Sequence, residues 1–186
     1  SPLFNRVIQG QYPPASTIKP FMGLAALDGE FITTDEIINC GPDYRIGKQK
    51  FRDWKRWGHG KIDMEQAIAV SSDVYFYKLA HKMGIDYIHD YLYNFGFGQK
   101  IDLPIQNQKK GLLPNHEWKK KTYNEPFYAG DTVIVGIGQG SFLATPLQIL
   151  NALSIIANDG KQLKMHFEKG LKPEVTKTLN LNKKFY

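Results

Sequence analysis

The sequence has little of what would cross-link a chain covalently or hold it in a membrane. Cys40 is the single cysteine in 186 residues, which excludes an internal disulfide framework. No stretch approaches the roughly 20 consecutive apolar residues that span a bilayer, and the N-terminus has no basic-then-apolar signal pattern. Internal repeats, low-complexity tracts and Gly/Ser linkers are also missing. These absences predict one compact unit, and its start at Ser1, without an initiator Met, is interpreted as that of an excised piece.

The composition is that of an ordinary globular protein. Hydrophobic residues make up 42% of the chain, charged residues 23% and aromatic residues 13%, so most of the chain is expected to pack. The 24 Lys and Arg against 18 Asp and Glu give a net charge of +6. This excess favours an anionic partner, such as a phosphate-bearing substrate, a membrane surface or a nucleic acid, without choosing among them.

The spacing of apolar residues between proline and glycine breaks predicts a mainly helical chain. Helices are expected over residues 16–27, 64–70, 74–83, 87–95 and 146–157. Thr145 is the predicted N-cap of the last of these. Its predicted buried stripe consists of Leu147, Leu150, Leu153 and either Ile156 or Ala157.

Three other stretches are predicted to be non-helical. Residues 132–137 are rich in β-branched side chains and predict a strand. Residues 39–60 contain repeated glycine breaks and predict an ordered irregular segment that is anchored by Trp54 and Trp57. Residues 161–186 form a tail with no clear pattern.

The sharpest chemical feature is Ser16-Thr17-Ile18-Lys19. Residues three apart on a helix share a face, which places the Ser16 hydroxyl beside the Lys19 amine in the first helical turn. A serine hydroxyl becomes a nucleophile when a base takes its proton, and a lysine can act as that base only in its neutral form. Burial and the positive end of the helix dipole both favour the neutral form. The alternative for such a short match is an exposed capping serine and a solvated lysine.

Further motifs accompany this pair. The segment 11–20 around Ser16 resembles the nucleophile segment of class B penicillin-binding proteins, whose superfamily carries the signatures Ser-x-x-Lys, Ser-x-Asn and Lys-Thr-Gly. Other segments resemble the elongation-type members in the right order, namely 51–60, 71–77, 111–114, 130–132, 136–140 and 144–148. The resemblance implies an α+β fold, the penicillin-binding protein/β-lactamase-like transpeptidase fold. Residues 1–186 would then be a partial domain that holds mainly the helical lobe and lacks most of the central antiparallel sheet.

The resemblance also implies an activity. It is that of a peptidoglycan D,D-transpeptidase, which cross-links stem peptides through a serine acyl-enzyme in cell elongation and rod-shape maintenance, and which β-lactams inhibit. Ser16 would be the nucleophile and Lys19 the base that activates it. Ser71 would relay the proton to the leaving amine, and Asp73 would complete the second motif. This chemistry requires no cofactor.

Two positions depart from the pattern of the family. Ala15 stands where a glycine is common, which restricts the backbone just before the nucleophile. Asp73 stands where the superfamily usually has Asn, and its carboxylate would favour the charged form of Lys19. The alternative interpretation of Ser71-Ser72-Asp73 is a helix break in which Asp73 caps the next helix.

The third signature is missing from the chain. Lys121-Thr122-Tyr123 and Lys177-Thr178-Leu179 lack the glycine and the strand context. In the family, the corresponding strand would follow residue 186, so the tail 161–186 would lead toward it. The piece alone is therefore expected to be inactive, because that strand supplies the second oxyanion donor and the carboxylate-binding groups.

A second cluster of chemically active residues consists of Cys40, Asp53 and His59. Thiolate, carboxylate and imidazole are all zinc ligands. Since elongation-type enzymes can carry a structural zinc beside the active site, the resemblance implies that these residues hold a zinc ion with a fourth, unknown ligand. Ser72 occupies the position of the family's cysteine ligand. The alternative is a buried free cysteine and a surface histidine.

Partners and location follow from the same resemblance. The expected partners are peptidoglycan stem peptides, lipid II-derived strands, β-lactam antibiotics, a shape-determining glycosyltransferase and the rod-shape scaffold protein. The catalytic domain would lie in the periplasm, on a bacterial inner-membrane anchor absent from this chain. No nucleic acid is expected, since it would explain the charge but none of the motifs. The alternative functions are a non-catalytic penicillin-recognising sensor or interaction module, and a β-lactamase.

Overall fold

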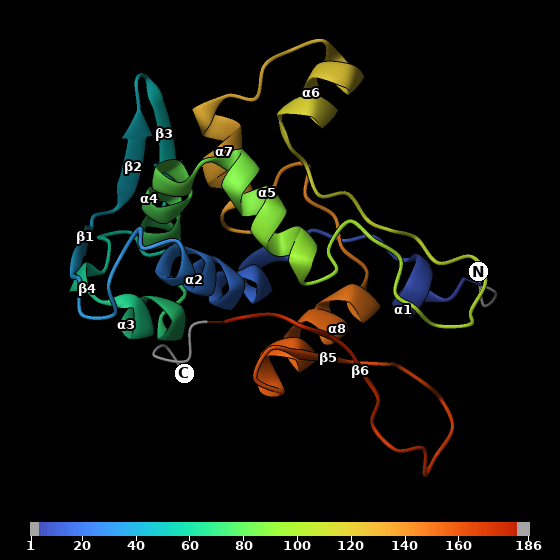
Figure 1. Ribbon diagram of the computed structural model, residues 1–186. Helices are drawn as coiled ribbons and strands as arrows, with labels where there is room; N and C mark the ends of the chain where they lie inside the picture. Colours follow the sequence, from blue (N-terminus) through green and yellow to red (C-terminus); the bar gives the residue numbers. More distant parts are fainter. Residues whose placement is uncertain (1–3, 182–186) are drawn as a thin grey trace.

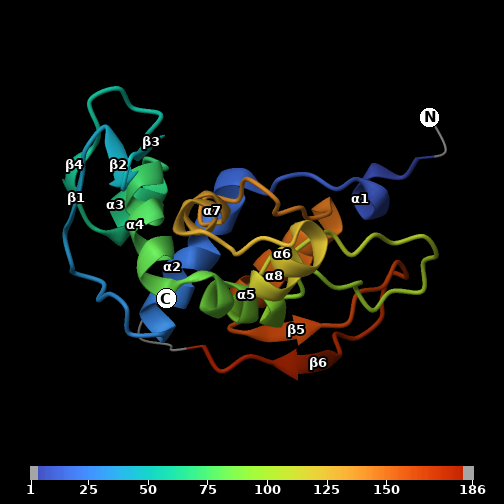
Figure 2. The same cartoon turned by 90° about the horizontal axis from the view of Figure 1, so that it is seen from above.

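The computed structural model describes residues 4–181, whose helices form the body of the molecule. The β1–β4 and β2–β3 strand pairs lie at one end of this body, and α1 lies at the other (Figure 1, Figure 2). None of the helices in this range is long and apolar enough to cross a membrane. In chain order the elements are α1 (Arg6–Gln9), the 3-10 turn η1 (Ala15–Ile18), α2 (Lys19–Asp28), β1 (Ile38–Cys40), β2 (Asp43–Ile46), β3 (Gln49–Arg52), β4 (Gly60–Ile62), α3 (Met64–Ala69), α4 (Asp73–Met83), α5 (Ile85–Asn94), α6 (His116–Tyr123), α7 (Ala129–Val135), α8 (Pro146–Ala157), β5 (Lys161–Leu163) and β6 (Val175–Thr178).

Helix α2 runs through the middle of the body and packs against α3, α4 and α5 (Figure 1). It is apolar and buried along most of its length, as expected for a helix surrounded by other elements. Phe21 packs edge-on against Phe95 and Phe97, with ring centroids 5.3 and 5.5 Å apart. The helix predicted from residue 16 is confirmed. Its first turn is the 3-10 turn η1, and Pro20 follows where α2 begins.

The segment predicted to be irregular, 39–60, forms two antiparallel strand pairs instead. Strand β1 pairs with β4 over three residues of each strand, and β2 pairs with β3 over four. The β2–β3 hairpin turns at Gly47-Lys48, where the φ of +56° at Gly47 suits a tight turn of this kind. The glycine breaks in the sequence therefore separate or end short strands.

Residues 132–137, predicted to be a strand, belong to α7 and the turn that follows it. The Asp131 carboxylate accepts a hydrogen bond from the Tyr128 N–H at 2.9 Å, which satisfies one of the backbone donors at the start of the helix. Helix α7 packs along α4, and Val133 and Val135 are buried there. Tertiary packing and this cap outweigh the strand preference of the β-branched residues.

Helix α8 starts as predicted, with Thr145 as N-cap. The predicted buried stripe is wrong in part, because Leu150 is 59% exposed and Leu153 41% exposed. The buried Gln148 side chain fixes the helix to a neighbouring loop by donating to the Gln99 carbonyl at 2.6 Å. The buried face consists of Leu147, Gln148, Asn151, Ala152 and Ile155.

The tail predicted to lack a pattern contains the antiparallel pair β5–β6. Lys177 and Thr178 lie in β6, so the strand context that the sequence did not reveal is present at this position. Lys177 Nζ lies 3.3 Å from the carbonyl of Asn94 in α5. The last part of the predicted tail, 182–186, and the first residues, 1–3, lie outside the described residues.

Candidate active site

Ser16 lies in η1, in the first turn before α2, as predicted. The chain enters this turn through Ala15, whose φ of +50° is a left-handed conformation that costs an L-residue about 1 kcal/mol. The Ala15 N–H donates to the Gly138 carbonyl at 2.9 Å. A Cβ at Gly138 would stand 2.4 Å from the Ala15 oxygen, so the two backbones could not approach in this way with another residue there. The turn after α7 therefore fixes the backbone next to Ser16.

The strain at residue 15 can be measured. Ala15→Gly is expected to raise the free energy of unfolding by about 1 kcal/mol, because glycine adopts a left-handed backbone without the Cβ penalty. Chemical denaturation of both proteins measures the difference. Ala26→Gly, in the buried middle of α2, is the matched control and should lose about 1 kcal/mol or more. A loss in Ala15→Gly of the same size would contradict the assignment of strain to this position.

Four polar side chains meet at the beginning of α2, those of Ser16, Lys19, Ser71 and Asp73. Lys19 is only 2% exposed. Its Nζ donates to the Ser71 carbonyl at 2.8 Å, to Ser71 Oγ at 3.0 Å and to Asp73 Oδ1 at 2.7 Å. Ser71 Oγ donates in turn to Ser16 Oγ at 3.0 Å. The structure thus joins the four predicted site residues in one hydrogen-bonded chain, with Ser71 between Ser16 and Lys19.

The direction of these hydrogen bonds defines the resting state of the site. Three donated bonds are the full capacity of an ammonium group, and one of them goes to the carboxylate of Asp73. A charged lysine cannot take a proton. For Lys19 to act as a base, both hydroxyl groups must rotate, so that Ser16 donates to Ser71 and Ser71 donates to a neutral Lys19. The conflict that the sequence predicts between Asp73 and Lys19 is therefore present in the geometry.

Ser71 is itself held in a left-handed conformation, with a φ of +54°. Trp54 Nε1 lies 3.2 Å from the carbonyl oxygens of both Val70 and Ser71, so this indole fixes the loop that carries Ser71. The sequence predicts Trp54 as an anchor but does not connect it to the site. Trp54 is 64% exposed and Trp57 is 78% exposed, so neither side chain anchors the segment by burial. Trp54 anchors it through its hydrogen bonds instead.

The alternative interpretation of Ser71-Ser72-Asp73 made Asp73 the cap of the next helix, but another residue caps α4. Ser72 is the N-cap, and its hydroxyl accepts a hydrogen bond from the Tyr75 N–H at 3.4 Å. Asp73 is the first residue of the helix, where its carboxylate interacts favourably with the helix dipole while it also contacts Lys19. The motif therefore starts the helix and forms the site with different side chains.

Asp53 connects the end of β3 to the start of α4. Its Oδ2 accepts hydrogen bonds from the Val74 N–H at 2.9 Å and the Ser72 hydroxyl at 3.0 Å. Its Oδ1 accepts from the Lys55 N–H at 3.2 Å and from His59 Nε2 at 3.1 Å. Burial alone would raise the pKa of this carboxyl, but the hydrogen bonds together outweigh it and hold the pKa below its ordinary value. The segment after β3 is thereby fixed beside the site.

The predicted zinc ligands are brought together only in part. Asp53 and His59 are in contact, and the side chain of His59 is 3% exposed rather than at the surface. Cys40 is buried, with its Sγ 3.7 Å from the Ile38 carbonyl, and burial raises the pKa of its thiol, which opposes the thiolate form. In the described part of the chain, no three His, Cys, Asp or Glu side chains are grouped so as to hold a metal ion. Protein donors occupy both Asp53 oxygens in this arrangement.

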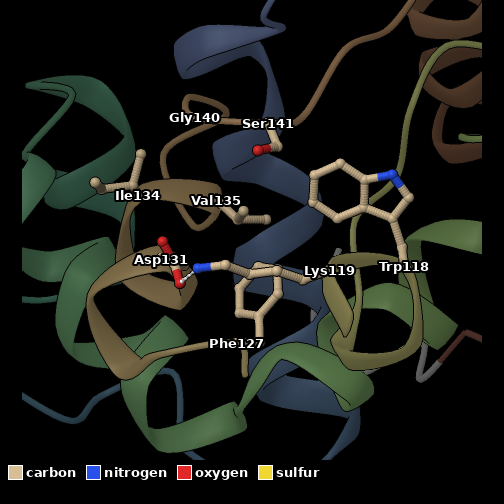
Figure 3. Close-up of a pocket in the computed structure, with 8 residues that line it drawn as sticks. All are labelled: Trp118, Lys119, Phe127, Asp131, Ile134, Val135, Gly140 and Ser141. Carbon is tan, nitrogen blue, oxygen red and sulfur yellow. Dashed lines mark hydrogen bonds and ion pairs between the residues drawn. The ribbon is translucent and has the colours of Figure 1, made fainter. Parts of the chain in front are cut away.

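A small cavity lies between α6 and α7. It has a volume of about 70 Å³, which is too small for a peptide. Figure 3 shows Lys119 reaching to the carboxylate of Asp131, with which it forms an ion pair, beside the ring of Phe127. This pair joins α6 to α7. The turn that follows α7 contains Gly138, which accepts the hydrogen bond from Ala15.

Comparison with known proteins decides to which family this arrangement belongs. The family model described as the penicillin binding protein transpeptidase domain matches residues 1–185 of this chain. The chain belongs to the penicillin-binding protein transpeptidase family. Its fold is the α+β transpeptidase fold that the resemblance implies, and the few strands of the chain fit a piece of that fold.

Members of the family are similar to almost the whole chain. It is 44% identical over 177 residues to the peptidoglycan D,D-transpeptidase MrdA of Haemophilus influenzae, covering 94% of this chain and 27% of that protein. The solved structure of Pseudomonas aeruginosa PBP2 in complex with WCK 5153 matches with a TM-score of 0.90 and 40% identity, over 96% of this chain and 42% of that one. Helicobacter pylori PBP2, in a complex with MreC, matches with a TM-score of 0.90 and 42% identity, over 96% and 33%. The chain spans about a quarter of the length of the curated relatives it matches, and the resemblance to elongation-type members is confirmed.

Proposed function

We propose that the protein containing this chain is a peptidoglycan D,D-transpeptidase that acts in cell elongation and rod-shape maintenance. Residues 1–186 are in this proposal part of its transpeptidase domain, and the chemistry needs no cofactor. The relatives named peptidoglycan D,D-transpeptidase support the activity. The single observation that carries the proposal is the position of Ser71, whose Oγ lies 3.0 Å from both the Ser16 hydroxyl and the Lys19 amine.

The proposed reaction transfers one acyl group twice. Ser16 Oγ attacks the carbonyl carbon of the penultimate D-Ala of a stem peptide, so that a C–O bond forms and the C–N bond to the terminal D-Ala breaks. The terminal D-Ala leaves as an amine after it gains a proton. An amine of a second stem peptide then attacks the ester carbonyl, so that a new C–N bond forms, the C–O bond to Ser16 breaks, and Ser16 Oγ regains a proton that the attacking amine gives up. The Ser16 N–H would donate one hydrogen bond to the oxyanion.

Lys19 and Ser71 move the proton in this scheme. Neutral Lys19 takes the proton of Ser16 through Ser71, because Ser71 Oγ is within hydrogen-bond distance of both groups. The same path returns the proton to the leaving amine. Asp73, 2.7 Å from Lys19 Nζ, stabilises the ammonium group that forms while the acyl-enzyme is made.

Covalent labelling tests the proposal. The strained amide of a β-lactam mimics D-Ala-D-Ala, so benzylpenicillin should add one penicillin mass to the peptide that contains Ser16. The protein used is this chain extended at both ends, and the chain alone is expected to stay unlabelled. An adduct on another residue, or no adduct on the extended protein, would contradict the proposal. Continuous release of hydrolysed penicillin would indicate a β-lactamase.

The proposal includes partners and a location. Stem peptides and lipid II-derived strands are the substrates, β-lactams are covalent inhibitors, and a shape-determining glycosyltransferase and a rod-shape scaffold protein are the protein partners. The complex of Helicobacter pylori PBP2 with MreC supports a scaffold partner. The domain would act in the bacterial periplasm, on an inner-membrane anchor outside this chain.

A structural zinc at Cys40, Asp53 and His59 stays a separate prediction, and no step of the proposed chemistry depends on it. Metal analysis of the native protein tests it. One equivalent of zinc per chain, lost in His59→Ala, would support the site, and only a trace of zinc would contradict the prediction.

A further inference from the structure

The net charge of the chain is concentrated in one short segment. Between residues 44 and 61 there is a single acidic residue, Asp53, and there are seven basic residues: Arg45, Lys48, Lys50, Arg52, Lys55, Arg56 and Lys61. This segment therefore carries a net charge of +6, the net charge of the whole chain. The rest of the chain has 17 basic and 17 acidic residues and is neutral overall. Any anionic partner that the charge favours should bind here.

Three of these basic residues line a groove beside the β2–β3 hairpin. The groove has a volume of about 480 Å³, and Lys50, Arg52, Arg56 and Trp57 contribute to its lining. We call it the cationic groove. It is large enough for several residues of an extended peptide, unlike the small cavity between α6 and α7.

Two carboxylates also line the cationic groove, but both have partners. Asp43 pairs with Arg45 Nε and with Lys50 Nζ, each at 3.0 Å. The oxygens of Asp53 accept hydrogen bonds from the backbone and from the side chains around them. Among the ion pairs of residues 4–181, none includes Arg52 or Arg56. Two exposed guanidinium groups are thus available to an anion from outside the chain.

The chemistry of these groups favours carboxylates on a peptide. A guanidinium group presents paired N–H donors that match the two oxygens of a carboxylate. The Arg56 guanidinium lies 4.9 Å from the centre of the Trp57 ring, which is 78% exposed and offers a flat apolar surface beside the charge. Such a combination binds a chain that carries both carboxylates and apolar groups.

The cationic groove is adjacent to the candidate active site. Arg52 and Asp53 line it, and the next residue, Trp54, donates to the carbonyl of Ser71. Asp53 accepts a hydrogen bond from the Val74 N–H at the start of α4. A peptide held in the groove therefore lies beside the loop that carries Ser71, and Ser71 contacts Ser16.

We propose that the cationic groove binds the carboxylates of the acceptor stem peptide, the peptide whose amine attacks the acyl-enzyme. This inference rests on the proposed function, and it assigns Arg52 and Arg56 to binding of the second substrate. Stem peptides carry free carboxylates, and an acceptor must approach Ser16 from outside after the donor has reacted. The position of the groove next to Ser71 favours this occupant over an anionic membrane surface.

The test compares two acceptors in the full-length protein. One is a synthetic peptide with a free side-chain amine and two carboxylates, and the other is the same peptide with both carboxylates amidated. A thioester donor supplies the acyl group. Arg52→Ala/Arg56→Ala is expected to raise the KM for the acidic acceptor about tenfold and to leave the KM for the amidated acceptor nearly unchanged. The preference of the unmodified protein for the acidic acceptor should decrease with added salt.

The control variant is Lys169→Ala/Lys172→Ala, which removes two exposed positive charges far from the hairpin in the sequence and should change neither KM. An equal rise in KM for both acceptors, or no rise for either, would overturn the inference. So would an unchanged KM together with a loss of binding to phosphatidylglycerol vesicles, which would identify a membrane-facing surface. Penicillin acylation of the unmodified protein is measured in parallel. Its absence would overturn the proposed function as well, whereas normal acylation with an unchanged KM would overturn this inference alone.

Discussion

Lys19→Ala is expected to slow acylation of Ser16 by about 10³-fold, in the range that removal of a general base produces. Lys19 is the buried group to which both Ser71 and Asp73 are hydrogen-bonded, and the structure has no second amine among them. Without it the proton of Ser16 has no acceptor at the end of the Ser71 path. Stopped-flow measurement of penicillin acylation gives the rate for each variant of the chain extended at both ends. The double variant Ser16→Ala/Lys19→Ala should be no more defective than Ser16→Ala, because the two residues act as one unit.

Two further variants separate the base from its charge. Lys19→Arg keeps a positive charge beside Asp73, but a guanidinium group does not lose its proton near neutral pH, so the rate should stay as low as in Lys19→Ala. Lys78→Ala is the matched control, because Lys78 Nζ donates to the carbonyl of Asn39 in β1 rather than to the groups around Ser16. Its rate should change little. Acylation of Lys19→Arg at the unmodified rate would show that Lys19 acts through its charge, against the proposed role as base.

Asp53→Ala is expected to lower the free energy of unfolding by about 3 kcal/mol, the second large effect. The substitution removes the acceptor for four hydrogen bonds and leaves the Val74 N–H and the Ser72 hydroxyl buried without it. It also removes the negative charge at the start of α4. Denaturant unfolding measures the change. Asp102→Ala, at an exposed carboxylate, should change stability by less than about 0.5 kcal/mol.

Lowering the pH should reproduce part of this loss in the free energy of unfolding. The pKa of Asp53 is lowered in the folded protein, so its contribution is fully present above the ordinary carboxyl pKa of about 4 and disappears as the pH falls through the lower folded pKa. In Asp53→Asn, a plot of stability against pH should lack the part of the decrease at low pH that comes from protonation of Asp53. A decrease identical to that of the unmodified protein would show that other carboxyl groups cause it.

The sequence predicts the candidate site better than the elements around it. Ser16 and Lys19 are three residues apart, so local geometry places them on adjacent turns, but the hydrogen bonds join their side chains through Ser71. The contribution of Ser71, 55 residues from Ser16, follows only from the family resemblance, because no local rule places it there. Asp73 follows in the same way, and its contact with Lys19 depends on how α4 packs on α2.

The sequence predictions that are wrong concern elements whose conformation or orientation depends on long-range packing. The run 132–137 has strand-like side chains, but it becomes helical because Asp131 starts a helix that packs on α4. Leu150 and Leu153 match a helical stripe, yet buried Gln148 shows that polar contacts with neighbouring loops decide which face of α8 turns inward. The cationic groove is visible in the sequence as an excess of charge. Its position beside the site depends on the fold of the hairpin.

The left-handed residues Ala15 and Ser71 flank the nucleophile from two different segments. Neither conformation is favourable for an L-residue by itself, so both persist only while α2, α4 and the turn at Gly138 are in place. Heating should therefore release these two backbones before the buried helices separate. The temperature at which acylation stops would then lie below the temperature of global melting, and cooling from between the two temperatures would restore activity without refolding of the whole chain.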